Sequence, residues 1–282
     1  MKLLRYGPPG QEKPGLADRD DKIRDLSGVV GDIDGAALAP ASLARLRGID
    51  PTSLPLVSGT PRLGPSVGAV SKIVAIGLNY RLHAQEAGAA IPSEPIFFMK
   101  AISSICGPND DVIIPKGSQK ADYEVELGIV IGSLARYVAK ADARKHVAGY
   151  CVVNDVSERE FQIERGGQWT KGKSADTFCP IGPWLVTADE IPDPGKLALW
   201  TEVNGERRQN SNTGDLIFGV DEIVSYVSRF MTLLPGDVIP TGTPSGVGMG
   251  FKPPKFLKPG DRMRLSVEGL GEQNQRLVAY TG

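Results

Sequence analysis

The chain has 282 residues, of which 41% are hydrophobic and 23% are charged, and its 32 basic and 33 acidic side chains leave a formal net charge of −1. This balance is typical of a globular protein with a sizeable core, and the absence of a basic arm or stripe argues against nucleic acid as a partner. No stretch approaches the roughly 18 consecutive apolar residues of a membrane-spanning helix, and the N-terminus lacks the apolar run of a signal peptide. We therefore expect a cytoplasmic protein without a membrane partner.

The numbers and positions of four residue types limit the possible metal sites and the fold class: cysteine, histidine, glycine and proline. Three widely spaced cysteines form neither a metal-binding nor a disulfide pattern, and two histidines are too few for the usual multi-histidine zinc site. The 34 glycines and 22 prolines gather in turn-like clusters between short runs rich in Val, Ile and Leu. Strands and helices do not alternate strictly, so the sequence predicts a β-rich α+β fold rather than a doubly wound parallel sheet.

The first part of the chain predicts two units. Residues 1–50 contain short strand-like runs and a helix-like ASLARLRGI, and a stretch dense in Pro, Gly and Ser follows at residues 50–68. We therefore predict a small N-terminal domain with its linker over residues 1–65 and a main domain over residues 66–282. The main domain begins with a strand, SKIVAIG, a short helix that Gly88 ends, and a second strand, EPIFFMKAI.

Two carboxylates stand two places apart in ADYEVELGIVIG, residues 121–132, which otherwise predicts a strand. Glu124 and Glu126 therefore project from one face of that strand. One interpretation is a half-exposed strand with a solvated acidic face. The other is a pair of metal ligands, because the continuation LGIVIG looks buried on both faces and carboxylates enter a buried sheet only when paired or metal-bound.

A third carboxylate, Asp155, ends the next predicted strand, YCVVND. Ser157 and Glu160 follow in the spacing of a capping box, so a helix is expected directly after the strand. With Glu124 and Glu126, Asp155 would complete an all-oxygen site suited to Mg²⁺ or Mn²⁺. The alternative for Asp155 is an ordinary turn or helix-capping residue.

His83 and Glu86 lie three positions apart in the predicted helix LNYRLHAQEAG and so share a face. A carboxylate beside an imidazole fixes its tautomer and raises its basicity, which suits a general base that activates water. The alternative is a structural hydrogen bond. His146 has no such partner and is assigned to the surface or to packing.

The stretch GQWTKGKS, residues 167–174, matches the phosphate-loop pattern G-x-x-x-x-G-K-[ST]. A phosphate loop needs a buried strand before it and a helix after it, whereas a charged helix is expected before this stretch and prolines follow. We instead predict a catalytic role for Lys173 of this stretch, since its ammonium suits a substrate carboxylate or a developing oxyanion. Lys171 is a weaker candidate for the same role.

A glycine-rich loop, PTGTPSGVGMG, occupies residues 240–250. Its glycines, Gly242 among them, allow close approach of backbone to a ligand, and Thr241 and Thr243 carry hydroxyl donors, so these three are predicted to bind substrate. A mobile hairpin connection is the alternative. Before this loop, DEIVSYVSRFMTL predicts an amphipathic helix with Asp221 as its cap.

Six of these stretches together resemble the fumarylacetoacetate hydrolase family over roughly residues 70–280: GLNYRLHAQE, PIFFMK, DYEVELGIVIG, NDVSEREFQ, KGKSADTFCPIGPW and PTGTPSGVG, in the family's order. The resemblance implies a mixed β-roll, usually a homodimer, and a divalent cation held by Glu124, Glu126 and Asp155. It also implies that His83 and Glu86 lie on a lid and that Lys173 faces the reacting carbonyl. The family's larger animal members use a further Asp ligand, whose equivalent has no evident place here, so a fourth protein ligand is left open.

The resemblance implies a metal-dependent hydrolase that cleaves a carbon–carbon bond in a small 2,4-diketo acid, either a 2,4-diketo-3-deoxy sugar acid or an acylpyruvate. Ureidoglycolate lyase, oxaloacetate decarboxylase and dienoate isomerase activities are alternatives within the family. A β-rich module that binds a cation or ligand without catalysis is the alternative outside it. The hydrolase is preferred because the His83 and Glu86 pair supplies water activation, which a lyase does not need.

Overall fold

A nine-stranded mixed sheet forms the centre of the molecule in the computed structural model, which describes all 282 residues. The strand order is β3-β2-β1-β13-β10-β9-β16-β4-β5. In that order the strands are Ile23–Asp25, Lys13–Ala17, Lys2–Tyr6, Leu185–Thr187, Val147–Asn154, Val125–Ile131, Val238–Pro240, Ile73–Gly77 and Ile96–Lys100. The β-rich α+β class predicted from the sequence is confirmed.

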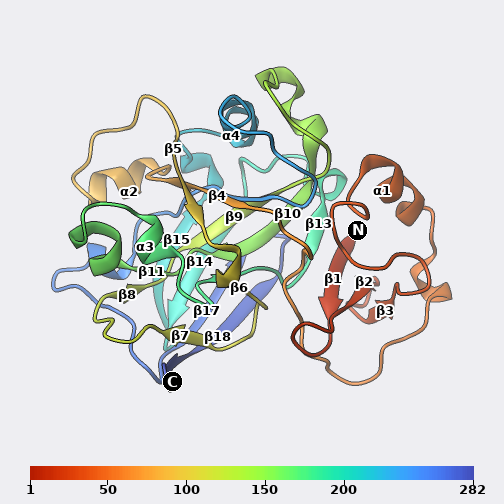
Figure 1. The fold of residues 1–282 in the computed structure, drawn as a ribbon, viewed down its shortest axis with the longest axis horizontal. Helices are drawn as coiled ribbons and strands as arrows, with labels where there is room; N and C mark the ends of the chain where they lie inside the picture. The colour runs from red at the N-terminus through yellow and green to blue at the C-terminus, as the bar shows by residue number, and fades with distance from the viewer.

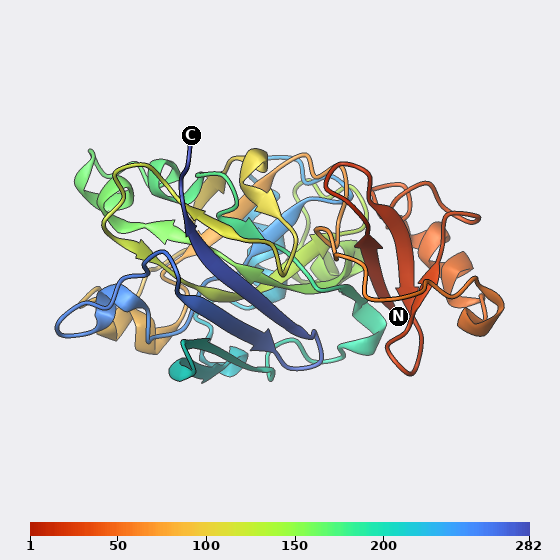
Figure 2. The same ribbon diagram turned by 90° about the horizontal axis from the view of Figure 1, so that it is seen from below.

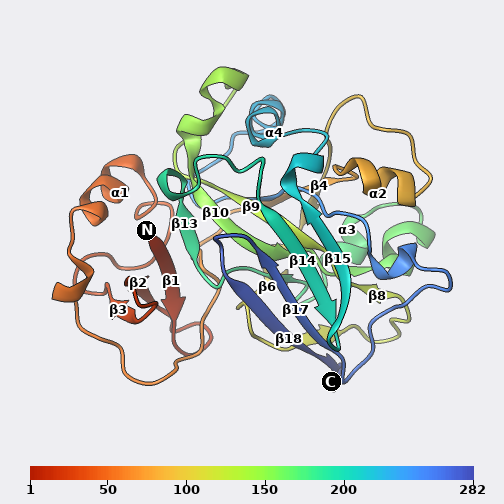
Figure 3. The ribbon, with the colours of Figure 1, turned by 180° about the vertical axis from the view of Figure 1, so that it is seen from behind.

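A five-stranded sheet packs against the central strands of the first, as Figures 1 and 3 show. Its order is β15-β14-β17-β18-β7, comprising Glu206–Asn212, Ala198–Val203, Arg262–Val267, Glu272–Ala279 and Val112–Ile114. Two short pairs complete the strands: β11 (Ser157–Glu158) with β8 (Ala121–Asp122), and β12 (Cys179–Pro180) with β6 (Ile105–Cys106). The α-helices are α1 (Pro40–Arg47), α2 (Arg81–Glu86), α3 (Thr170–Lys173) and α4 (Val220–Val227).

Strands β9 and β10 are buried on both faces, as the apolar run LGIVIG predicts. Leu127 and Ile129 point into the larger core, which the second sheet and α4 complete, while Val130 points into a second core on the other face. Strands enclosed in this way carry a continuous apolar sequence. A carboxylate placed in either strand is therefore withdrawn from water.

The N-terminal segment forms a lobe at one end of the molecule, visible in Figures 1 and 2. Its strand β1 pairs with β13, so β1, β2 and β3 extend the central sheet. Leu3, Leu26 and Leu46 of this lobe share a core with Val153 and Ile181 of the main body. The predicted boundary near residue 65 stays a prediction, but backbone pairing and a shared core join the lobe to the rest.

Two local expectations from the sequence are wrong. Ser157 is not a helix cap but lies in β11, where its hydroxyl donates to the Asp155 carbonyl, and the helix that follows, Glu160–Glu164, has π geometry. The cap of α4 is Gly219, while Asp221 lies in the first turn and pairs with Arg144. No helix of the structure has the length and apolar character needed to cross a membrane.

Candidate metal-binding active site

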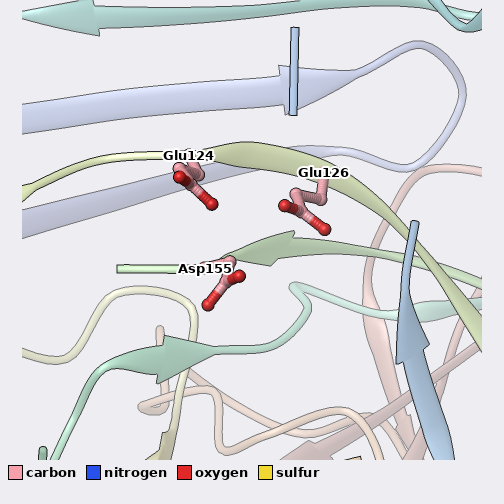
Figure 4. A group of neighbouring side chains, drawn as sticks. All are labelled: Glu124, Glu126 and Asp155. Carbon is pink, nitrogen blue, oxygen red and sulfur yellow. The ribbon is translucent and has the colours of Figure 1, made fainter. Parts of the chain in front are cut away.

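Three carboxylates meet where strands β9 and β10 pair. Glu126 lies in β9, Glu124 directly precedes it and Asp155 directly follows β10. The antiparallel register pairs Val125 with Asn154, which places Asp155 opposite Glu124, and the Asp155 amide donates to the Glu124 carbonyl at 2.9 Å. One ligand oxygen from each of the three side chains lies within 4.8 Å of the other two, and Figure 4 shows the carboxylates gathered between the two strands.

These three side chains are buried, with exposed fractions of 5% for Glu124 and 1% each for Glu126 and Asp155. The solvated acidic face is therefore excluded as an interpretation of ADYEVELGIVIG. Buried carboxylates are tolerated only when other charges or ligands compensate them. Two buried lysines supply part of that compensation: Lys173 Nζ lies 2.6 Å from Glu124 and 2.7 Å from Asp155, and Lys100 Nζ lies 2.5 Å from Asp155.

The two glutamates differ in electrostatic environment. Burial raises the pKa of Glu124, but Lys173 and Arg159 outweigh that effect and bring the pKa down to about 2. Burial, Asp155 and Glu124 raise the pKa of Glu126 well above its usual value, and its one hydrogen bond comes from the Gly242 amide, at 2.7 Å. The cluster thus contains one carboxyl that lacks a compensating cation.

This donor set fits a hard divalent cation. Carboxylate oxygens are the ligands that Mg²⁺ and Mn²⁺ prefer, and a cation held by these three would take waters to complete its octahedron. A double positive charge beside Glu126 would favour its ionised form, so binding would be coupled to release of its proton. No fourth carboxylate, imidazole or thiol joins Glu124, Glu126 and Asp155 in the group.

Lys173 reaches the carboxylates from α3 and is 2% exposed. Burial acts to lower its pKa, but Asp155 and Glu124 outweigh burial and raise the pKa above its usual value, so the side chain is an ammonium. The phosphate-loop interpretation of GQWTKGKS is excluded, because a π-helix and a turn, not a buried strand, precede α3. Lys171 is exposed and donates to the Arg165 carbonyl.

His83 and Glu86 lie together on α2, where His83 Nδ1 is 2.9 Å from Glu86 Oε2. Glu86 Oε1 also accepts a hydrogen bond from the Gly246 amide at 2.8 Å, which ties α2 to the glycine-rich loop. With Nδ1 engaged by Glu86, Nε2 of His83 remains for a water or a substrate. His146 instead contacts the hydroxyl of Ser133.

One cavity of about 300 Å³ joins these groups, since its lining includes His83, Lys173 and all three carboxylates. Of the loop residues predicted to bind substrate, only Thr243 lines it. Thr241 donates its hydroxyl proton to the Leu127 carbonyl, and Gly242, at φ +103°, directs its amide to Glu126. The structure thus brings eight of the nine predicted residues into one connected arrangement and places Thr241 against strand β9.

Lys100 and Arg159 are functional residues that the sequence patterns did not predict. Arg159 is 4% exposed, lines the cavity, and donates to Asp122 at 2.8 Å and to Glu124 at 2.7 Å, while its Nη2 has no hydrogen-bond partner. A buried guanidinium with a free N–H is suited to an anionic oxygen. The available signal was its place four residues after Asp155. Lys100 ends a strand whose alternation, Ile96, Phe98, Lys100, directs it to the same side as the cavity.

A family model, related sequences and solved structures were compared with this chain, and they agree on the family to which it is similar. Residues 72–278 match the family described as fumarylacetoacetate (FAA) hydrolase C-terminal. A protein of Burkholderia lata, whose name says only that it is provisionally a hydrolase, is 64% identical over 276 residues, which are 98% of each chain. Solved structures with related folds also include proteins named as isomerases.

Two solved structures cover essentially the whole chain. A fumarylacetoacetate hydrolase from Exiguobacterium antarcticum is 36% identical, with a TM-score of 0.87, and covers 99% of this chain and 100% of its own. A maleylpyruvate hydrolase from Sphingobium sp. SYK-6, in complex with manganese(II) and pyruvate, is 31% identical, with a TM-score of 0.82 and complete coverage of both chains. With a family match over residues 72–278 and a relative at 64% identity, the chain belongs to the fumarylacetoacetate hydrolase family.

Proposed function

We propose that this protein is a Mg²⁺- or Mn²⁺-dependent hydrolase that cleaves the carbon–carbon bond of a small 2,4-diketo acid. One observation carries the proposal: a single cavity is lined by a three-carboxylate site, an ammonium, a guanidinium with a free N–H and the imidazole of His83, which Glu86 holds from outside the lining. Such a substrate presents a carboxylate and a 2-keto oxygen for chelation, beside a second carbonyl that water attacks. The manganese and pyruvate in the maleylpyruvate hydrolase structure support this proposal by similarity.

The cation, when bound, supplies Lewis-acid polarisation of the 2-keto group. His83, held by Glu86, takes a proton from a water molecule through Nε2, and the water oxygen bonds to the C4 carbonyl carbon. The bond between C4 and the C3 methylene then breaks, and its electron pair passes to C3 as the enolate of pyruvate. Lys173 and the free N–H of Arg159 stabilise that developing charge, and a proton on C3 completes pyruvate and a carboxylic acid.

The other activities found in the family differ from hydrolysis in whether they need a general base that activates water. Ureidoglycolate lyase, oxaloacetate decarboxylase and dienoate isomerase reactions need no activated water. The His83 and Glu86 geometry therefore favours hydrolysis, although proteins named as isomerases share the fold. A binding module without catalysis leaves the same pair unused.

A chelator-sensitive turnover panel tests the proposal. The protein is loaded with Mg²⁺ or Mn²⁺ and offered acylpyruvates, a 2,4-diketo-3-deoxy sugar acid, ureidoglycolate and oxaloacetate. We expect pyruvate and a carboxylic acid from the diketo acids only, and loss of turnover when the metal is chelated. Turnover restricted to ureidoglycolate or oxaloacetate would replace the hydrolase with a lyase or a decarboxylase, and bound metal without any turnover would favour a binding module.

A further inference from the structure

The cavity has two chemically different halves. Its charged lining residues are the three carboxylates, Lys173 and Arg159, and all of them belong to the connected cluster around Glu124. The rest of the lining is largely apolar. It comes from β4 and the residue after it, from α2 and the segment that follows it, from β5, from the π-helix, from the segment just before α3 and from the glycine-rich loop. Four of the apolar lining residues, Ile96, Phe98, Ile163 and Trp169, come from β5, from the π-helix and from the segment just before α3.

Three residues of strand β5 lie at increasing depth, from Ile96 near the surface to Lys100 in the interior. Ile96, Phe98 and Lys100 alternate onto one face, and successive members lie about 6.6–6.8 Å apart along the strand. Lys100 is 2% exposed at Asp155, Phe98 is partly buried, and Ile96 is 39% exposed. The face therefore runs from the carboxylate cluster to the rim of the cavity and becomes apolar after its first residue.

Aromatic contacts continue the same path. Lys173 Nζ lies 5.2 Å from the centre of the Phe98 ring, and the Phe98 ring lies 5.4 Å from that of Trp169 in an edge-on arrangement. Trp169 in turn packs so closely on Gly77 that a Cβ there would come within 2.2 Å of its ring. The apolar wall is thus built on the sheet itself and begins directly beside the ammonium.

No lysine or arginine beyond Lys173 and Arg159 lines the cavity, and both of these are paired with Glu124. Its one hydroxyl side chain is Thr243, which donates to the Val125 carbonyl and accepts from Gln209. A second carboxylate on the substrate would lie against this wall without a counter-ion, and sugar hydroxyls would find no partner among the side chains of Ile96, Phe98, Ile163 and Trp169. The one side-chain amide of the lining, Gln162, accepts from Arg159 and so belongs to the charged cluster. Desolvation without compensation disfavours both kinds of tail.

We propose that the wall of Ile96, Phe98, Ile163 and Trp169 is the specificity determinant of the enzyme, and that it selects 2-keto acids whose tail is alkyl or aryl over those whose tail carries a carboxylate or several hydroxyls. This inference rests on the proposed function for the orientation of the substrate, with its keto-acid head at the carboxylate cluster. Within that function it names acylpyruvates with an apolar acyl group as the preferred class over 2,4-diketo-3-deoxy sugar acids.

Binding of unreactive 2-keto acids tests the inference without relying on hydrolysis. 2-Oxo-5-methylhexanoate and 2-oxoglutarate carry tails of the same shape, one ending in two methyl groups and the other in a carboxylate. We expect the Mn²⁺-loaded protein to bind the first at least tenfold more tightly in titration calorimetry, equivalent to about 1.4 kcal/mol. Equal affinity, or tighter binding of 2-oxoglutarate, would overturn the proposal.

Two variants place a cation on the wall. Ile163→Arg and Ile96→Arg change side chains that are 47% and 39% exposed, so folding should tolerate them. Each should reduce the affinity ratio at least fivefold by gaining 2-oxoglutarate binding. Ile102→Arg is the matched control, because Ile102 is 55% exposed and does not line the cavity, and its ratio should stay within twofold of the parent protein. An unchanged ratio in both wall variants would contradict the assignment.

Turnover of benzoylpyruvate, maleylpyruvate and a 2,4-diketo-3-deoxy sugar acid forms the second arm. A higher kcat/KM for benzoylpyruvate than for the other two supports the inference, and a higher value for either of the others overturns it. If none of the three is hydrolysed while the tenfold binding preference holds, the proposed function fails and the selectivity of the wall stands. If benzoylpyruvate is hydrolysed without that binding preference and without a kcat/KM advantage, the inference fails and the proposed function stands.

Discussion

Glu126 differs from its two carboxylate neighbours in what surrounds it. Lysine ammonium groups contact Glu124 and Asp155, whereas Glu126 receives only the backbone amide of Gly242. Burial and the two neighbouring carboxylates raise the pKa of Glu126, which favours its protonated form, and a bound divalent cation would favour its ionised form. The spacing of Glu124 and Glu126 in the sequence predicts that they share a face. The difference in charge around the carboxylates depends instead on Lys100, Lys173 and Arg159, which lie in other segments of the chain.

We propose that the imidazole of His83 activates water, so its loss should affect rate and leave the cation site intact. We expect His83→Ala to lower kcat by roughly 10²–10⁴-fold, the usual contribution of a positioned base. The Mn²⁺ affinity measured by titration calorimetry should change less than threefold, because His83 is not among the three carboxylate ligands. Equal losses in rate and in metal affinity would instead place His83 in the metal site.

The thiol of Cys179 makes stability depend on alkaline pH. Burial raises the pKa of this thiol to about 12, whereas an unfolded thiol ionises near a pKa of about 8.5. Between these values the unfolded state releases a proton that the folded state keeps, so rising pH lowers the free energy of unfolding by about 1.4 kcal/mol per pH unit. The contribution is complete below the unfolded pKa and is lost as pH rises toward the folded one.

Cys179→Ala removes that titration. Urea unfolding at pH 9 and pH 10 under reducing conditions should show the stability of the parent protein falling faster than that of the variant, by about 1.4 kcal/mol over the unit. Parallel losses in the two proteins would show that the thiol titrates in the folded state as it does in the unfolded one. Tyr6 and Tyr150, which also have raised pKa values, are common to both proteins and cancel in the difference.

Among the secondary-structure elements, the sequence predicts the strands that carry the site better than the tertiary contacts around them. Strong signals in β4, β5, β9 and β10 come from apolar runs bounded by turns, and each strand appears in the structure. The capping box at Ser157 is wrong because residues 157 and 158 pair with β8, a tertiary contact that local spacing does not contain. The same pairing brings Asp122 to Arg159 and so fixes the guanidinium that the sequence did not reveal.

Gly149 allows β10 and β13 to pair closely at the centre of the large sheet. A Cβ at this position would lie 2.2 Å from the Val186 carbonyl oxygen and 2.9 Å from the Thr187 Cα. Gly149→Ala should therefore lower the free energy of unfolding by about 1–3 kcal/mol, the cost of overpacking against backbone. Gly28→Ala is the control, since a Cβ there meets nothing within 4 Å, and it should change stability by less than about 0.5 kcal/mol. Similar stabilities in urea titrations of the two variants would contradict this account.

At the scale of the whole molecule, the N-terminal lobe and the main body share one sheet and one core. The sequence indicates a separate small domain because a stretch rich in Pro, Gly and Ser follows it, but composition does not show that β1 pairs with β13. Pairing between segments more than 180 residues apart leaves no local signal in the chain. The homodimer that the family resemblance implies stays a prediction, and a mass near twice 30.1 kDa in light scattering would support it.

Leu3→Ala tests how the lobe and the body are coupled. Leu3 is fully buried in the core that both parts share, so its truncation should cost about 2–5 kcal/mol. Differential scanning calorimetry should show a single transition that moves as a whole to lower temperature. Two transitions, of which only the smaller one shifts, would show instead that residues 1–65 unfold as an independent domain.

We propose that a divalent cation on Glu124, Glu126 and Asp155 supports hydrolysis of an acylpyruvate. The most direct test of this proposal is turnover of benzoylpyruvate in ¹⁸O-water by the Mn²⁺-loaded protein, with products identified by mass spectrometry and Glu126→Gln as the control. We expect equal amounts of pyruvate and benzoate, one ¹⁸O in the benzoate carboxylate, and loss of both products in the variant together with its bound Mn²⁺. Retained turnover in a variant without bound metal, or products without ¹⁸O in benzoate, would contradict the proposal.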